Sequence, residues 1–176
     1  MKKIWINILC KVLFIIVVFG VILGLVDIHT DGILIRDAFY EVRTGDSQFK
    51  MDVIGGSQIP GALVQVIKIS QGGDQTFEIK YVQGDEYAIM YENTGLCIAV
   101  ASDKETVVAQ NYDEKNDYNR WHIERIGKSQ KYLLTNVATN TSLYYEYSSE
   151  KKIYFMKVGE YDDENGHFEF LLVKSN

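Results

Sequence analysis

The chain has 176 residues, a formal net charge of −6, two cysteines and a single proline. This acidic balance disfavours binding to nucleic-acid phosphates, and two cysteines are too few for a disulfide framework. The 12 tyrosines and 8 phenylalanines stand largely in stretches that alternate apolar and polar residues, which is typical of β-strands.

The first 26 residues differ in character from the rest. They carry Lys2, Lys3 and Lys11 and no acidic residue, and residues 4–26 are apolar apart from Asn7 and Lys11. As a helix this run is long enough to cross about 30 Å of hydrocarbon. Since its lysines lie on the N-terminal side, we expect a single-pass signal anchor with a cytoplasmic N-terminus and the domain outside the cell membrane. A cleaved signal peptide, which would leave a secreted domain, is the alternative.

Residues 27–37 read as a short stalk or linker, and residues 38–176 as one domain. Without the three lysines of the anchor this remainder carries a charge of −9 (−6 minus 3). Turn-forming Gly, Asn, Asp and Ser separate twelve predicted strands, and no sustained helical period occurs among them. The predicted strands are 39–42, 49–53, 63–67, 76–79, 87–91, 97–100, 106–111, 121–125, 132–136, 142–145, 152–157 and 168–172.

The strands form three copies of one pattern. Each copy opens on a tyrosine and closes on a strand that begins with an aromatic residue. The opening residues are Tyr40, Tyr87 and Tyr132, and the predicted closing residues are Phe77, Trp121 and Phe168. The openings are 47 and 45 residues apart and the closings 44 and 47. A near-fixed period indicates one structural unit repeated, and three such units can close on themselves without leaving strand edges exposed. The sequence therefore predicts an all-β, threefold barrel.

The order of the motifs resembles the ricin-type (QxW) lectin family, whose fold is the β-trefoil. Repeat one matches through MDV, LVQV and QTF, and repeat two through YAIMYENTGLCIAV, TVVAQNY and NRWHI. Repeat three follows the pattern with YLLTNVATNTSLYY. The resemblance covers about residues 38–173. It implies a β-trefoil of three repeats of about 45 residues, and sugar binding as the activity.

In this family, a competent repeat uses an Asp on its second strand, an aromatic residue on its third, and amides near the Q-x-W position. The ring covers the apolar face of a sugar, while carboxylate and amide groups satisfy its hydroxyls. Carried over by resemblance, the repeat-one site comprises Asp52, Gln65, Asp74 and Gln75, with Ile67 standing where the stacking ring is expected.

The other two repeats lack the full set. Repeat two has Ala99 in place of the Asp, but Tyr112 and Asn119 form a secondary candidate site. Repeat three has Tyr144 at the Asp position and Gly166 at the Gln position. The closing aromatics are interpreted as core residues. A glycan, bound weakly and at one site, is therefore the partner that the resemblance implies.

No catalytic, metal or cofactor motif stands out, so we expect neither an enzyme nor a cofactor. His122 and His167 read as surface residues at equivalent repeat positions, and His29 lies in the stalk. The acidic residues 162–164 read as a turn rather than a cation site. Cys97, within the apolar stretch LCIAV, is interpreted as a small buried hydrophobic residue.

Two functions are compatible with these features. The first is a lectin-like, carbohydrate-binding module, tethered to a membrane or secreted. The second is a trefoil with degenerate sugar sites that binds a surface protein through exposed tyrosines, because tyrosine is enriched at interfaces. The candidates for such a patch are Tyr144, Tyr145, Tyr147 and Tyr154. An aromatic ring facing Asp52 within one sugar width would favour the first function.

Overall fold

The computed structural model describes residues 35–71 and 75–175. The predicted anchor, most of the stalk and Asp74 lie outside these residues. A compact unit comprises Leu34–Asn176. Within the described ranges, no helix is both long and apolar enough to cross a membrane.

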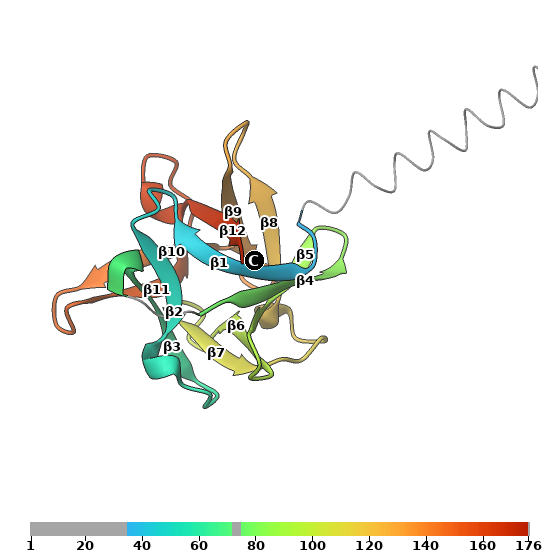
Figure 1. Ribbon diagram of the computed structural model, residues 1–176. Coiled ribbons are helices and arrows are strands. Elements are labelled where there is room, and N and C mark those ends of the chain that lie inside the picture. The colour runs from blue at the N-terminus through green and yellow to red at the C-terminus, as the bar shows by residue number, and fades with distance from the viewer. Residues whose placement is uncertain (1–34, 72–74, 176) are drawn as a thin grey trace, which may run out of the picture. The chain divides into compact units, whose positions relative to one another are not determined.

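Six strands form a closed barrel (Figure 1). They pair antiparallel in a ring, each strand with two neighbours, and the ring closes where the last strand meets the first. In the order around the ring, the strands are β1 (Ala38–Thr44), β4 (Phe77–Gln83), β5 (Glu86–Tyr91), β8 (Trp121–Arg125), β9 (Lys131–Asn136) and β12 (Phe170–Lys174). Closure leaves no free edge in this layer.

The other six strands form three hairpins, one from each repeat. They are β2 (Phe49–Val53) with β3 (Ala62–Lys68), β6 (Leu96–Val100) with β7 (Val107–Asn111), and β10 (Ser142–Ser148) with β11 (Ile153–Gly159). The hairpins meet one another through β3–β7 and β3–β11 pairs and a Thr106–Lys157 bridge. A six-stranded barrel capped by three mutually paired hairpins is a β-trefoil, so the predicted all-β fold is confirmed.

Inward-facing side chains of all three repeats share one core. Phe77, Trp121 and Phe170 are fully buried in it. The indole N–H of Trp121 donates a 2.8 Å hydrogen bond to the carbonyl of Ile98, which satisfies the polar atom that this large side chain carries into the core.

The closing residue of repeat three is Phe170, and the prediction of Phe168 is wrong. Phe77, Trp121 and Phe170 each begin a barrel strand. Each pairs with the last residue of a neighbouring strand, which is Tyr91, Asn136 or Thr44 respectively. Phe168 instead ends the short 3-10 helix η4 (Gly166–Phe168), as Asn119 ends η3 (Asp117–Asn119). Asn116 and Asn165 cap these two turns in the same way.

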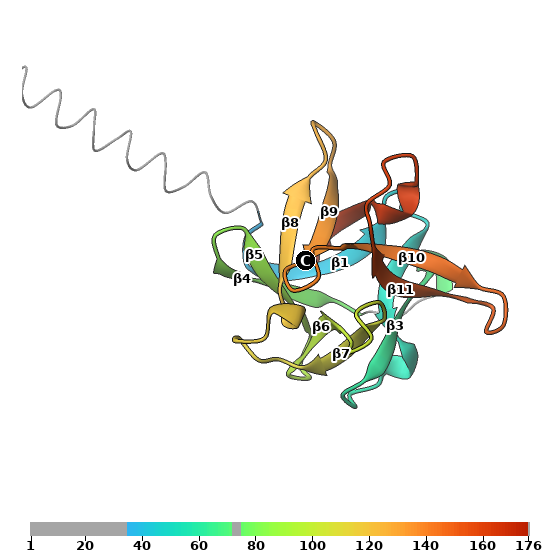
Figure 2. The same ribbon diagram turned by 180° about the vertical axis from the view of Figure 1, so that it is seen from behind.

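The third hairpin is longer than the other two. Seven residue pairs join β10 to β11, whereas five pairs join β2 to β3 and five join β6 to β7. Figure 1 and Figure 2 show this hairpin projecting from the body of the barrel.

Candidate functional site

The strand register fixes which residues are equivalent on the second strand of each repeat. Arg43 pairs with Lys50, Met90 with Cys97 and Thr135 with Ser142, always seven residues on. Two residues further along stand Asp52, Ala99 and Tyr144. The structure therefore confirms these three as equivalent, and among them only repeat one carries a carboxylate.

The third strand differs from the prediction. Lys50 pairs with Ile67, and the equivalent Cys97 pairs with Gln110. Gln65 therefore does not correspond to Gln110. The aromatic residue of repeat two, Tyr112, donates its N–H to the Gly95 carbonyl, and Ile69 donates its N–H to the equivalent carbonyl of Gln48. Ile69, and not Ile67, therefore occupies the place of the aromatic residue in repeat one. The reason is that the β2–β3 hairpin carries extra residues between its strands, which short motif matching does not register.

Gln65 is nonetheless part of the repeat-one site, because it pairs directly with Asp52. Its side-chain N–H donates a 2.8 Å hydrogen bond to the Asp52 carboxylate. Asp52 is 6% exposed, and this burial raises the pKa of its carboxyl; the bond from Gln65 and the nearby Lys50 charge act in the opposite sense. The second carboxylate oxygen has no hydrogen-bond partner within the described ranges.

Gln75 positions the end of β2. Its Oε1 accepts a 2.6 Å hydrogen bond from the Val53 N–H, and its Nε2 donates to the Val53 carbonyl at 3.2 Å. The chain then turns through Gly55 and Gly56, both with positive φ, a conformation that glycine adopts without steric cost. Asp74 lies outside the described residues, so its place in the site stays a prediction.

Tyr91, from the end of β5, adds a hydroxyl to this site that sequence reasoning missed. A side chain at Gly56 would approach within 3.8 Å of the Tyr91 hydroxyl and 3.9 Å of the Gln75 amide. Burial and then the Asp52 charge raise the pKa of Tyr91. Since Tyr91 belongs to the next repeat, its proximity depends on pairing between repeats and carries no local sequence signal.

In repeat two, Asn119 is fully buried and its amide is used inside the protein. It accepts a 2.9 Å hydrogen bond from Gln110 and donates to the Asp113 carbonyl at 3.2 Å. Tyr112 is half-buried. A nearby depression of about 210 Å³ is lined by Val100, Ala101, Ser102, Gln110, Asn116 and Tyr118. Gln110 and Tyr118, which motif matching did not select, therefore face solvent space beside the secondary candidate site.

Repeat three carries aromatic rings at the site positions. Tyr144 stacks on Phe168 with 5.0 Å between centroids, and Tyr161 meets Phe168 edge-on at 5.7 Å. Because η4 aligns with η3, Phe168 occupies the position of Gln75 and Asn119, and the assignment of Gly166 to that position is wrong. Gly159 lies close to the Tyr144 ring, since a Cβ atom added at Gly159 would stand 3.1 Å from the nearest ring carbon.

The two histidines of the domain are not equivalent, contrary to the prediction. The alignment of η4 with η3 matches His167 with Tyr118, and each of these residues is the middle one of its 3-10 turn. His122 lies on β8, where its Nδ1 is 3.0 Å from the Asp85 carboxylate. His167 stacks on Tyr145 with centroids 4.3 Å apart. No group of three potential metal ligands occurs in the described part of the chain.

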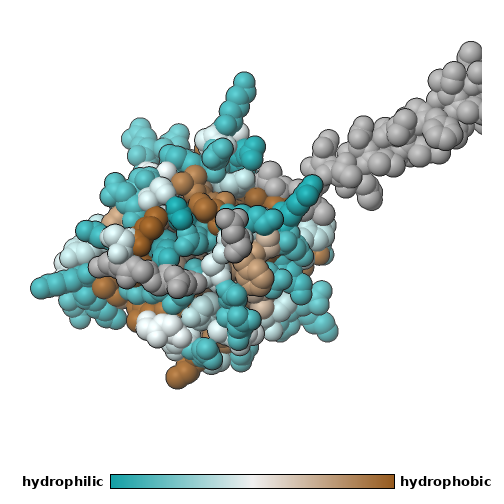
Figure 3. All heavy atoms as spheres, in the orientation of Figure 1, coloured by the Kyte–Doolittle hydropathy of each residue, from teal (hydrophilic) through white to brown (hydrophobic). Residues whose placement is uncertain are grey.

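One face of the domain is mostly polar. Figure 3 shows hydrophilic side chains over most of this face, with apolar residues scattered among them. Within the proposed tyrosine patch, Tyr145 is buried and Tyr144 packs on Phe168. The ring centroids of Tyr147 and Tyr154 lie 5.1 Å apart. These four tyrosines therefore do not form one continuous exposed surface.

Comparison with known families supports the resemblance. A family model described as "Ricin-type beta-trefoil lectin domain-like" matches residues 73–152, from the end of repeat one into repeat three. The similarity to ricin-type lectin domains is thus confirmed over this segment, which is less than half of the chain. No curated protein matches the sequence.

Solved structures with the same fold share little sequence. The designed threefold-symmetric protein ThreeFoil aligns with a TM-score of 0.70 at 20% identity, over 79% of this chain and 100% of its own. A mosquitocidal holotoxin aligns with a TM-score of 0.69 at 18% identity, over 81% of this chain and 18% of its own. A Polyporus squamosus lectin, bound to a sialylated epitope, aligns with a TM-score of 0.66 at 12% identity, over 80% and 50%. At these identities the matches support the fold alone.

Proposed function

We propose that the domain is a non-catalytic carbohydrate-binding module that holds a glycan weakly at repeat one. The observation that carries this proposal is the Asp52–Gln65 pair, in which a buried carboxylate is oriented by an amide and keeps one oxygen without a hydrogen-bond partner among residues 35–71 and 75–175. Carboxylate and amide groups are the acceptor and donor that sugar hydroxyls need. The Tyr91 hydroxyl, beside Gly56 and the Gln75 amide, lies close enough for the Asp52 charge to raise the pKa of Tyr91.

The proposed affinity is low, because repeat one carries Ile69 where the family places its stacking ring. A monosaccharide bound by a few hydrogen bonds alone is expected to have a dissociation constant of about 1 mM, corresponding to about 4 kcal/mol. Repeats two and three lack the carboxylate, and in repeat three the site positions are filled by rings that pack on one another.

A glycan array probed with the full-length chain, kept in detergent because of its apolar N-terminal run, tests this function. Wild-type protein is expected to bind a subset of neutral glycans, and Asp52→Ala to lose that binding. Ala is already present at this position in repeat two, so the fold accommodates it. A wild-type protein that binds no glycan at high density would contradict the proposal.

Binding to a surface protein is the second candidate. Tyr147 on the third hairpin and Tyr161 beside Phe168 favour it, since they are 51% and 42% exposed. Exposed tyrosines are enriched at protein interfaces. For either function we propose export, with residues 4–26 as an uncleaved anchor or as a cleaved signal peptide.

A further inference from the structure

The strand register places Phe155 of the third hairpin in line with the repeat-one site. Asp52 on β2 pairs with Gln65 on β3, and Gln65 pairs in turn with Phe155 on β11. Phe155 then pairs with Glu146 on β10. Directly paired residues project to the same face of a sheet, so these four side chains form one lateral row. This row lies on the outer face, because Met51, Val66 and Met156 alternate with it and are buried in the core.

The spacing of the row suits one sugar. Adjacent strands lie about 4.8 Å apart, so Phe155 stands roughly 10 Å from Asp52 along the row. A hydrogen bond of about 3 Å at the carboxylate end and a stacking contact of about 4 Å at the ring leave room for a pyranose above Gln65.

The ring of Phe155 has no ring partner within residues 35–71 and 75–175. On the other face of the same hairpin, Tyr145, Tyr147 and Tyr154 contact one another or Phe49. Phe155 is only half-buried, and the Lys151 ammonium stands over its ring, with Nζ 5.1 Å from the centroid. One face of the ring is thus covered by a flexible side chain from the hairpin turn.

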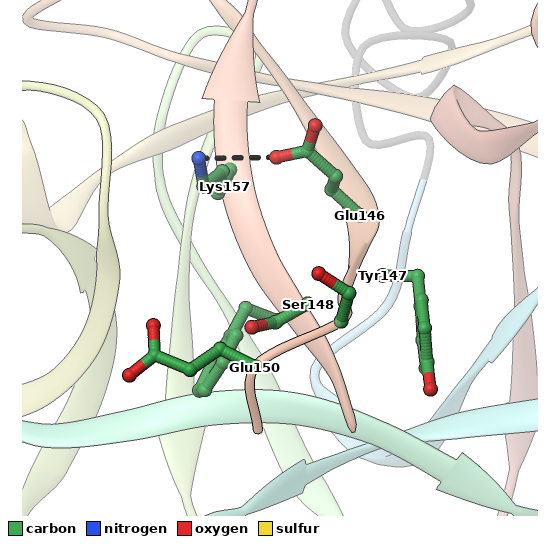
Figure 4. Close-up of a pocket in the computed structure, with 7 residues that line it drawn as sticks. Glu146, Tyr147, Ser148, Glu150 and Lys157 are labelled. Carbon is green, nitrogen blue, oxygen red and sulfur yellow. Dashed lines mark ion pairs between the residues drawn. The ribbon is translucent and has the colours of Figure 1, made fainter. Parts of the chain in front are cut away.

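Phe155 also lines a depression of about 340 Å³ near the turn of the hairpin, within the range of small-ligand sites; Asp52 and Gln65 are not among its lining residues. Figure 4 shows part of its lining, in which Lys157 forms an ion pair with Glu146. Tyr147 and Glu150 project to opposite sides of the hairpin in this view. Lys157 Nζ lies 2.8 Å from Glu105 and 3.1 Å from Glu146, which holds both side chains in place. Ser148 and Ser149 add hydroxyls that can donate and accept.

We propose that Phe155 is the stacking ring of the repeat-one site, supplied by repeat three in place of the missing aromatic at Ile69. The ligand that we propose is a neutral saccharide, because the carboxylate of an acidic sugar would be repelled by that of Asp52. This proposal rests on the proposed function. It gives a role to the extension of the third hairpin. The other two hairpins end at Val53–Val64 and Val100–Val107, which correspond to Tyr145–Met156, and Glu146–Phe155 is the first pair beyond that point.

Titration of the full-length chain with lactose and with sialylated lactose tests the proposal. Phe155→Leu, which keeps an apolar side chain of similar size but removes the ring, is expected to weaken lactose binding about fivefold to tenfold. Phe155→Trp is expected to strengthen it. Tyr161→Ala, which removes a 42% exposed ring of repeat three that does not line this depression, is the matched control and should leave binding unchanged. The sialylated sugar should bind more weakly than lactose.

The outcomes separate the two proposals. If wild-type protein binds no saccharide, the proposed function fails and the role of Phe155 fails with it. If Asp52→Ala abolishes binding while Phe155→Leu leaves it intact, the function stands and the role of Phe155 is overturned. Equal losses in Phe155→Leu and Tyr161→Ala would also overturn it, because they would show a general effect of removing a ring from repeat three.

Discussion

Asp52 and Gln65 lie directly opposite each other on β2 and β3, and the Gln65 amide donates a 2.8 Å hydrogen bond to the Asp52 carboxylate. The pair keeps a carboxylate on a surface that is largely removed from water. Such burial is unfavourable for the charged form of the group, so the arrangement is expected to reduce stability in exchange for a binding site.

Replacing Asp52 with Asn should stabilise the domain at neutral pH while weakening sugar binding. Burial raises the pKa of Asp52 above its ordinary value of 3.8, so the folded state favours the protonated carboxyl. The stability that this preference contributes is fully present below the unfolded pKa and is lost as the pH rises through the folded pKa. The variant has no charge to bury and avoids this loss.

Thermal unfolding of wild type and Asp52→Asn between about pH 3 and about pH 7 measures the effect. The stability difference in favour of the variant should grow as the pH passes the pKa of Asp52 and then become constant. A variant that is less stable than wild type at neutral pH, by an amount that does not change with pH, would show that the Asp52 charge is well compensated.

Trp121 is expected to be the most costly core residue to truncate. Trp121→Ala removes a fully buried side chain and its hydrogen bond to Ile98, which should lower the free energy of unfolding by about 3–5 kcal/mol. The neighbouring His122→Ala, on the outer face, should change it by no more than about 0.5 kcal/mol. Denaturant unfolding compares the two, and similar values for both would argue against the shared core of the three repeats.

Much of the fold could be predicted from sequence, because turn residues and alternating strands recur at one period. The second-strand equivalence of Asp52, Ala99 and Tyr144 was recoverable since the preceding turns have equal lengths. The closing residue of repeat three was not. Its motif HFEF offers Phe168 and Phe170 two residues apart, and only barrel pairing shows that Phe168 belongs to the preceding turn.

The candidate site was less predictable, because part of it comes from other repeats. Tyr91 reaches the site from the end of β5, and Phe155 joins its row through a β3–β11 pair. Neither residue lies within any local motif that contains Asp52. Pairing between hairpins depends on the closed fold and leaves no mark in the spacing of residues along one repeat.

Cys97 should be inert in the folded protein. Burial raises the pKa of its thiol to about 12, so almost no reactive thiolate is present near neutral pH. In a Cys10→Ser background, a thiol-specific reagent is expected to label Cys97 only after denaturant is added. Labelling of the native protein at the rate of a free thiol would contradict its placement in the core.

The orientation of the chain is a prediction from the three N-terminal lysines. A reporter that is active only outside the cytoplasm, fused after Asn176, should be active in the membrane fraction. A released and active product would indicate a cleaved signal peptide instead. A silent reporter at full expression would contradict export, and a fusion with the lysines replaced by glutamates serves as the control for orientation.

Chemical-shift mapping of the ¹⁵N-labelled protein during titration with lactose tests the central claim most directly. The account predicts that the largest shifts occur along the row formed by Asp52, Gln65 and Phe155, that they saturate in the millimolar range, and that Asp52→Ala abolishes them. Shifts confined to the surroundings of Tyr112 and Asn119 would move the site to repeat two. The absence of any shift at saturating sugar would contradict carbohydrate binding and leave recognition of a surface protein as the function.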